Sequence, residues 1–175
     1  KRLLEEALAA GALGMSSGLF TAPGSYAKGE EMVELGAVLK RRGARYFTHL
    51  RDEANKVFGA VEEAIIFAER TGVHVQIVHI KLSGTDNWGG AAKLLRTLAD
   101  ARAAGIGIGC DQYPYTATST GLSLLVPAWA LEGGDSAYQR RALDPALRER
   151  ILREVATALD STQGGREPRR VQFAR

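Results

Sequence analysis

The sequence is poor in cysteine and in long apolar runs. Its single cysteine, Cys110, excludes an internal disulfide and suits a reducing compartment, so we expect a cytoplasmic protein. No apolar stretch approaches the roughly 18 residues that a membrane span needs, and no signal peptide is recognisable. These absences argue against a membrane partner.

Charge of one sign is also scarce. The net charge is only +3, from 23 Lys and Arg against 20 Asp and Glu. Many of the arginines lie between positions 140 and 175, where acidic and apolar residues are mixed among them. No aromatic residues that could stack on bases alternate with these arginines. The mixture of arginines with acidic and apolar residues is typical of a solvated helix and loop. No nucleic-acid partner is predicted.

Four short apolar segments recur at nearly constant spacing. They occupy residues 13–16, 45–48, 74–78 and 107–110. Their centres are about 31 residues apart, which is the length of a βα unit. Helical patterns over residues 30–42, 57–68 and 94–101 fill the gaps, and each one stops at a glycine. Strict alternation of this kind predicts parallel strands with helices outside them.

The two ends of the chain differ from this pattern. Residues 1–10 have a helical pattern without an initial methionine, a loop is expected over residues 121–135, and a helix over Pro145–Leu159. Val171–Phe173 resembles the start of another strand. We therefore expect the central βα units in residues 1–135, and a helical insertion with the start of a further strand in residues 136–175. Both ends indicate an internal fragment of a larger protein.

An open flavodoxin-like sheet is the alternative to a barrel. Its glycine-rich phosphate loop is missing, because Gly18, Gly24 and Gly29 are too scattered to form GxGxxG. Polar residues follow three successive predicted strands, as they do at the mouth of a barrel. We therefore predict an α/β protein that forms part of a TIM-type (β/α)8 barrel of the metal-dependent hydrolase kind.

Two histidines stand at the ends of neighbouring predicted strands, His49 and His79. Neutral imidazole is a good zinc ligand, and a catalytic zinc usually has about three protein ligands and a water, so the pair is an incomplete set. Each histidine could instead hydrogen-bond a neighbouring loop. His74 stands at the start of its predicted strand, and strand alternation turns its side chain to the face opposite to that of His79. We therefore interpret His74 as a structural residue.

Further polar residues surround this pair in the sequence. Asp52 or Glu53 is expected to cap the helix that begins near Asn55, and orientation of His49 by one of them is the alternative. We expect Asp111 to orient a loop or helix rather than to act as a base.

The third strand end is followed by residues that suit an anion. Tyr113 and Tyr115 share one predicted face, opposite to Cys110, which we assign to the core as a small packing residue. A tyrosine hydroxyl, a serine hydroxyl and the ammonium group of Lys81 could together hold a carboxylate. Packing in the barrel wall is the alternative for the two tyrosines.

In these motifs the sequence resembles the D-aminoacylases (N-acyl-D-amino-acid deacylases) of the amidohydrolase superfamily. The resemblance covers about Leu3 to Ser123. It is carried by Gly11–Gly18, Thr48–Glu53, His79–Lys81, Asp111–Tyr115 and Ser119.

The resemblance implies that His49 and His79 are zinc ligands at the ends of barrel strands five and six, so that the chain covers about strands four to seven. It also implies that Lys81, Tyr113 and Ser119 bind the carboxylate of a small-molecule substrate, an N-acyl-D-amino acid. Zinc-dependent hydrolysis of its amide bond would give a D-amino acid and a carboxylate.

Other parts of the family's site are expected outside the sequence. The His-x-His motif and the metal-binding cysteine should lie upstream of Lys1, and the general-base aspartate downstream of Arg175. No catalytic base is therefore assigned within the 175 residues, and we expect them to be inactive alone. Ile80 stands where the family has a second histidine after its strand-six ligand.

Two other functions remain open at this stage. One is a cyclic-amide hydrolase of the dihydroorotase or hydantoinase type, against which the set of Lys81, Tyr113 and Ser119 argues. The other is a non-catalytic, amidohydrolase-like scaffold, which the loss of one ligand outside the sequence would produce.

Overall fold

The structure, a computed structural model, describes residues 1–160 and Glu167, and the described chain divides into two compact units. The first unit consists of Lys1–Leu82 and Gly89–Pro114, and the second of Ser83–Trp88 and the chain from Tyr115 onward. The strand predicted at Val171–Phe173 lies outside the described residues. In the described part of the chain, no helix is long and apolar enough to cross a bilayer.

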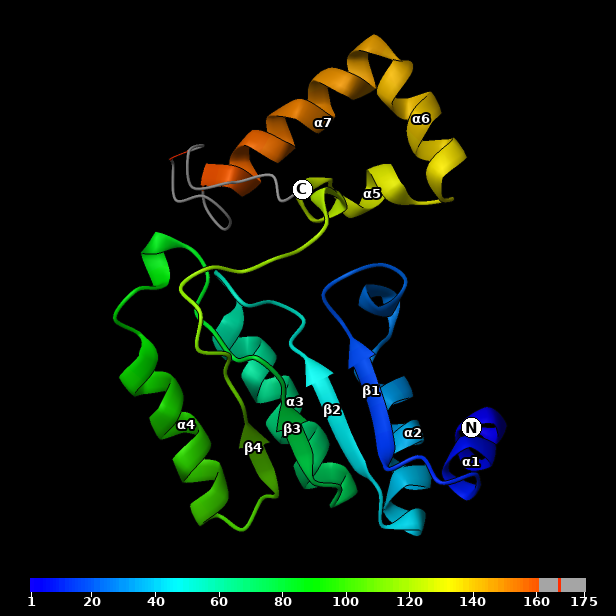
Figure 1. The fold of residues 1–175 in the computed structure, drawn as a ribbon, viewed down its shortest axis with the longest axis vertical. Helices are drawn as coiled ribbons and strands as arrows, with labels where there is room; N and C mark the ends of the chain where they lie inside the picture. The colour runs from blue at the N-terminus through cyan, green and yellow to red at the C-terminus, as the bar shows by residue number, and fades with distance from the viewer. Residues whose placement is uncertain (161–166, 168–175) are drawn as a thin grey trace. The chain divides into compact units, whose positions relative to one another are not determined.

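Strands and helices alternate along the first unit (Figure 1). Its elements are α1 (Arg2–Ala9), β1 (Gly14–Gly18), a 3-10 helix (Gly24–Tyr26), α2 (Gly29–Arg42), β2 (Arg45–His49), α3 (Val57–Thr71), β3 (Val75–Ile77), α4 (Ala91–Ala103) and β4 (Ile108–Cys110). The strands pair in parallel in the order β1-β2-β3-β4. The four predicted strands and the helices between them are confirmed.

Helices α2 and α3 end where the sequence predicts. The residue after each is a glycine in the left-handed conformation, Gly43 with φ 63° and Gly72 with φ 64°. Glycine enters this region without the steric cost of a Cβ atom, so it is a common helix terminator. At the other end of α2, Glu30 and Glu31 place negative charge near the positive end of the helix dipole.

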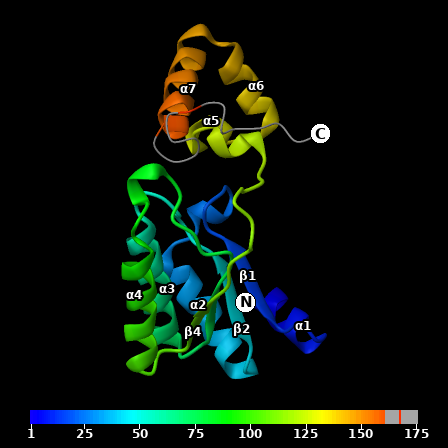
Figure 2. The same cartoon turned by 60° about the vertical axis from the view of Figure 1, so that its left-hand side comes forward.

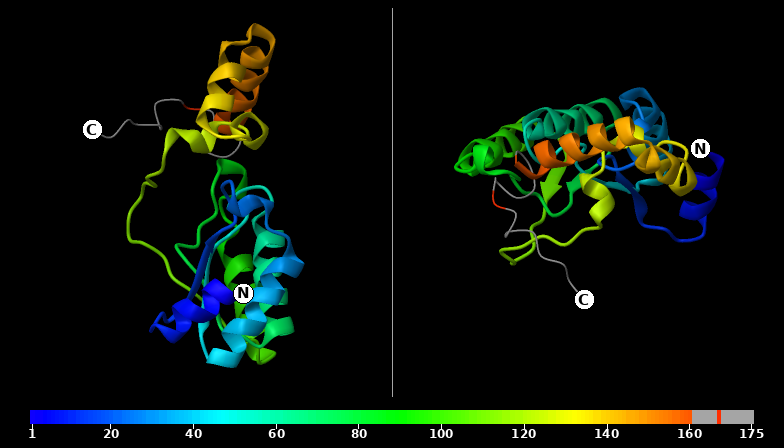
Figure 3. Two further views of the ribbon diagram at one scale, coloured as in Figure 1. Left: turned by 90° about the vertical axis from the view of Figure 1, so that its right-hand side faces the viewer. Right: turned by 90° about the horizontal axis from the view of Figure 1, so that it is seen from above.

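The helices α2, α3 and α4 lie on the same face of the sheet (Figures 2 and 3). A doubly wound open sheet has helices on both faces, whereas the wall of a (β/α) barrel has all its helices on the outside. The arrangement confirms the predicted partial barrel and contradicts the flavodoxin-like alternative.

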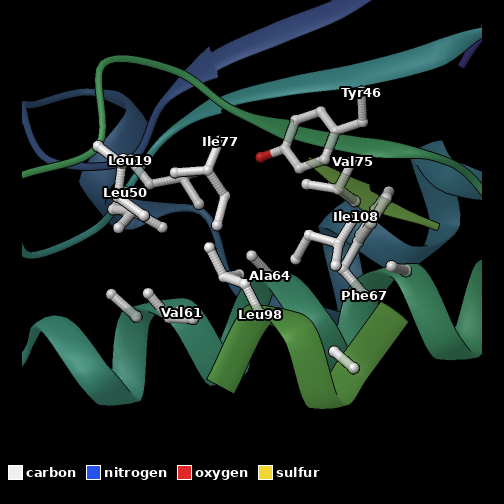
Figure 4. Packing of buried hydrophobic residues seen from close by; sticks show 14 of the residues in the cluster. Leu19, Tyr46, Leu50, Val61, Ala64, Phe67, Val75, Ile77, Leu98 and Ile108 are labelled. Carbon is white, nitrogen blue, oxygen red and sulfur yellow. The ribbon is translucent and has the colours of Figure 1, made fainter. Parts of the chain in front are cut away.

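One apolar core fills the space between the sheet and these helices (Figure 4). Val75 and Ile77 of β3 are fully buried, and they point toward α3 and α4, where Val61 and Leu98 are also fully buried. Each such side chain contributes about 1.5–3 kcal/mol relative to leaving it exposed. The core therefore fixes which face of each strand is turned away from the helices.

Successive side chains of β2 alternate between the core and the opposite face of the sheet. The ring of Tyr46 packs against Phe67 of α3, with ring centroids 4.6 Å apart. The next residue, Phe47, pairs in register with Gln76 of β3, and both are only half-buried on the opposite face. That opposite face corresponds to the interior of a barrel.

The second unit is helical. Its elements are two 3-10 helices (Thr85–Asn87 and Leu122–Leu125), α5 (Ala128–Leu131), α6 (Asp135–Leu143) and α7 (Pro145–Ala158). Helix α7 confirms the helix predicted from Pro145, and Asp144 caps it by accepting a hydrogen bond from the N–H of Leu147 at 2.9 Å.

The loop predicted over residues 121–135 is wrong in part, because it contains the second 3-10 helix and α5. Pro127, with φ −60°, immediately precedes α5. Proline lacks the N–H that a helix interior needs, so its place just before the first helical residue is compatible with a helix boundary. The division of the chain at residue 135 stays a prediction.

Candidate metal and carboxylate site

The carboxyl ends of β2 and β3 bring two histidines together. His49 is the last residue of β2, and His79 follows β3 by two residues. Nδ1 of His49 lies 2.9 Å from Nε2 of His79, and the rings meet edge to face with centroids 4.5 Å apart. The two nitrogens are within hydrogen-bonding distance of each other, and each is also a ligand atom that suits a metal ion.

A turn, rather than strand alternation, places His79. Strand β3 ends at Ile77, and His79 adopts a left-handed backbone conformation with φ 41°. Asp111, directly after β4, holds this turn by accepting a hydrogen bond from the N–H of His79 at 2.7 Å. Its other oxygen accepts from the side-chain amide of Gln76 at 2.9 Å. These hydrogen bonds lower the pKa of Asp111, which agrees with its predicted orienting role.

Glu53, which the sequence offered with Asp52 as a helix cap or as an orienting group for His49, also contacts His79 and Lys81. It is 9% exposed, and its Oε1 atom lies 2.6 Å from Nζ of Lys81 and 3.2 Å from Nδ1 of His79. The same oxygen is 3.7 Å from Nε2 of His49. One buried carboxylate oxygen thus faces both histidines and the lysine.

The neighbouring Asp52 has the local structural role. Its Oδ1 accepts hydrogen bonds from the N–H groups of Ala54 at 2.8 Å and Lys56 at 2.9 Å, so it stabilises the turn that leads into α3. The predicted helix cap by Asp52 or Glu53 is wrong, because α3 begins at Val57 and no side chain caps it. Since Asp52 makes the turn, Glu53 is the one that lies beside His49.

Lys81 and Tyr113 join the histidines. Nζ of Lys81 lies 2.9 Å from Nδ1 of His79 and 5.6 Å from the ring centroid of Tyr113. Burial and the charge of Glu53 raise the pKa of Tyr113, so its hydroxyl stays protonated near neutral pH. Ser119 belongs to the second unit, in the exposed segment before the Leu122–Leu125 helix.

Arg51, the basic residue that follows β2, has a structural role instead. Its guanidinium forms a bidentate pair with Glu63 of α3, with both N–O distances 2.9 Å. It also donates to the carbonyl groups of Ser25 and Ala27, at 3.0 and 2.9 Å. Arg51 therefore fixes the segment after β1 against α3 and does not join the histidine pair.

The histidine pair and Glu53 fit a metal ion. Among the described residues, His49, Glu53 and His79 can each offer a ligand atom within 4.8 Å of the others. Burial is the main cause that lowers the pKa of His49, and it outweighs the attraction of Glu53. His49 is therefore held neutral, which is the form that binds metal. Among the described residues, the buried Nε2 atom of His49 has no hydrogen-bond partner.

Cys110 and His74, the two other residues considered as metal ligands or site residues from the sequence, are not part of this site. Cys110 packs against the core beneath the sheet, which confirms its assignment as a packing residue. His74 lies at the start of β3, against Gly107 and Gly109 of the adjacent β4 segment. A pocket of about 230 Å³, partly open to solvent, lies on the helix side of β2, and none of the site residues lines it.

No protein-family model matches the chain, but it is similar to several known proteins. The chain is 36% identical over 156 residues to an N-acyl-D-glutamate deacylase of Alcaligenes xylosoxydans xylosoxydans, which covers 89% of this chain and 31% of the relative. A solved D-aminoacylase, a representative of a novel subset of amidohydrolases, matches with a TM-score of 0.65 and 36% identity over 67% of this chain and 24% of that one.

The chain belongs to the D-aminoacylase family. A further solved relative is the N-acyl-D-glutamate deacylase from Bordetella bronchiseptica, in complex with zinc and a phosphonate inhibitor that mimics the tetrahedral intermediate of the reaction. It matches with a TM-score of 0.63 and 36% identity over 65% of this chain and 24% of that chain. The chain thus spans about 31% of the length of the curated relative from Alcaligenes xylosoxydans xylosoxydans.

Proposed function

We propose that the whole protein is a zinc-dependent hydrolase that cleaves the amide bond of N-acyl-D-amino acids, releasing a D-amino acid and a carboxylate. The observation that carries the proposal is the pair of facing imidazoles, His49 and His79, with the ammonium group of Lys81 beside them. A cation held by the histidines and an anion held by the lysine would lie next to each other, as a substrate with an amide and a free carboxylate requires. Relatives named for D-amino-acid substrates support the stereochemistry.

The two histidines are the proposed zinc ligands. Two imidazole nitrogens are a donor set that zinc prefers, and the neutral state of His49 leaves a lone pair available. When bound, zinc would activate water and polarise the acyl carbonyl group. The relative from Bordetella bronchiseptica was solved in complex with zinc, which supports zinc as the metal.

Lys81 is the proposed anchor for the substrate carboxylate. Its side chain is only 17% exposed, so its charge is less screened by water than that of a surface lysine. The hydroxyl group of Tyr113 is a neutral donor near it, and Ser119 is the third proposed donor. A carboxylate held by these groups would orient the acyl group relative to the histidines.

Glu53 and Asp111 already accept hydrogen bonds within the site. Asp111 holds the N–H of His79, and Glu53 holds the ammonium group of Lys81. We therefore assign neither as the general base of the reaction. Proton transfer to the leaving amine stays unassigned among the described residues.

The test is amino-acid release from matched N-acetyl-D- and N-acetyl-L-amino acids by the whole protein, with and without a chelator. We expect release from the D series alone, lost with chelator and restored by zinc. Release from neither series, with ring opening of a hydantoin or dihydroorotate, would replace the proposal with cyclic-amide hydrolysis. No turnover of either substrate class would instead favour a non-catalytic scaffold.

A further inference from the structure

The inference concerns Glu53 and rests on the proposed zinc site. Its Oε1 atom is within 2.6 Å of Lys81 Nζ, 3.2 Å of His79 Nδ1 and 3.7 Å of His49 Nε2. The residue is 9% exposed, and burial of a charge is costly unless charged or polar partners compensate it. A carboxylate in this position therefore needs its two close partners, Lys81 and His79, while His49 Nε2 lies beyond hydrogen-bonding distance.

The ring nitrogens near Glu53 are not the ones that face each other. His49 Nδ1 and His79 Nε2 form the facing pair, 2.9 Å apart. A neutral imidazole has one lone-pair nitrogen and one N–H, so lone pairs on the facing nitrogens put the protons on His79 Nδ1 and His49 Nε2. Both protons are then on the nitrogens nearest to Glu53.

This proton arrangement also settles the partner of Lys81. Nζ of Lys81 lies 2.9 Å from His79 Nδ1, a contact that forms a hydrogen bond only if that nitrogen has a lone pair. Once the lone pair of His79 is on Nε2, its Nδ1–H can only donate. Glu53 is then the acceptor that satisfies both His79 and Lys81.

We propose that Glu53 is a positioning residue, not a metal ligand, which couples the zinc site to the carboxylate site. It fixes the tautomer of His79 by accepting from Nδ1–H. It also offsets the positive charge of Lys81, which would otherwise repel a cation held by the two histidines. Carboxylates that accept the second N–H of a ligating histidine orient the ring and increase its basicity.

The test measures zinc affinity of the whole protein by competition with a chromophoric chelator, together with zinc stoichiometry. We expect Glu53→Gln to keep the wild-type stoichiometry but to bind zinc about 10–100-fold more weakly. Lys81→Met should bind zinc at least as tightly as the wild type. The Glu53→Gln/Lys81→Met double variant should regain part of the lost affinity, because the uncompensated ammonium group is gone. A purely structural role for Glu53 gives no such rescue.

Glu62→Gln is the matched control, since Glu62 is an exposed carboxylate on α3. It should leave zinc affinity unchanged. Loss of zinc stoichiometry in Glu53→Gln, or one fewer oxygen ligand by X-ray absorption, would show that Glu53 is itself a ligand and overturn the proposal. Unchanged affinity would overturn it too. The assay uses no substrate, so its outcome is independent of whether N-acyl-D-amino acids are hydrolysed.

Discussion

At the scale of single residues, His79 combines a functional position with an uncommon backbone conformation. Its φ of 41° lies in the left-handed region, which residues other than glycine rarely adopt, at a cost of order 1–3 kcal/mol. The hydrogen bond from its N–H to Asp111 compensates part of this cost. The turn points the imidazole toward His49, which an extended continuation of β3 would not guarantee.

Lys81 gives a prediction at the same scale. We expect Lys81→Met to raise KM for N-acyl-D-amino acids by about 10–100-fold, because a charge-assisted hydrogen bond to the substrate carboxylate is lost. Zinc content should stay at the wild-type level. Steady-state kinetics with metal analysis of the same preparation measures both.

Lys93→Met is the control for that substitution. Lys93 is an exposed lysine of α4 whose ammonium lies over the ring of Phe58, 4.1 Å from its centroid, and it contacts no site residue in the described structure. The KM of the Lys93→Met variant should equal that of the wild type. An unaltered KM in Lys81→Met would remove Lys81 from the carboxylate site.

At the scale of elements, α2 and α3 approach each other closely at Gly36. A Cβ atom there would lie 2.5 Å from Cγ2 of Thr71 and 2.9 Å from Cζ of Phe67. We expect Gly36→Ala to lower the free energy of unfolding by about 1–3 kcal/mol, because overpacking outweighs the gain in helix propensity. Urea unfolding of the whole protein measures the change.

Gly59, within α3, is the matched comparison for this substitution. A Cβ atom added there meets no atom within 4 Å apart from its own helix. Gly59→Ala should therefore stabilise the protein by about 1 kcal/mol through helix propensity alone. If both variants changed stability in the same direction, close packing at Gly36 would not be the cause.

The elements that sequence reasoning found are those with a strong local signal. Strands β1 to β4 are short apolar runs about 31 residues apart, and α2 and α3 stop at glycines. Helix α6 (Asp135–Leu143) was missed because only Ala137 of its nine residues is buried, so it has little apolar periodicity.

The candidate site shows the same division between local and distant causes. Strand ends indicated His49, His79 and Lys81 from the sequence. The turn at His79 depends on Asp111, 32 residues away, and the position of Glu53 depends on Lys81, 28 residues away. Contacts over such separations leave no local pattern, so the turn and the Glu53–Lys81 pair could not be predicted, although the sequence offered Glu53 as one of two residues beside His49.

At the scale of the whole molecule, zinc should act as a link between neighbouring strands. A ligand that binds only the folded state stabilises it, by about 2.7 kcal/mol at a concentration 100-fold above Kd. We expect zinc to raise the Tm of the chelator-treated whole protein and His79→Ala to abolish that rise. Differential scanning calorimetry with and without zinc measures it.

His74→Ala is the control, because His74 lies at the start of β3 rather than at its end. It should retain the zinc-dependent rise in Tm even if its own Tm is lower. A rise that persisted in His79→Ala and disappeared in His74→Ala would place the metal elsewhere.

The strand order has a consequence for how the protein is made. Each strand pairs with the one before it in the chain, so a polypeptide leaving the ribosome can add one βα unit at a time to an edge already present. His49 and His79 are brought together once the third strand, β3, has paired with β2. Asp111, which holds the turn at His79, follows the fourth strand, β4. The proposed cation site should therefore become rigid only after the fourth strand has been added, and an ion captured earlier in synthesis would meet a site that can still adapt to it.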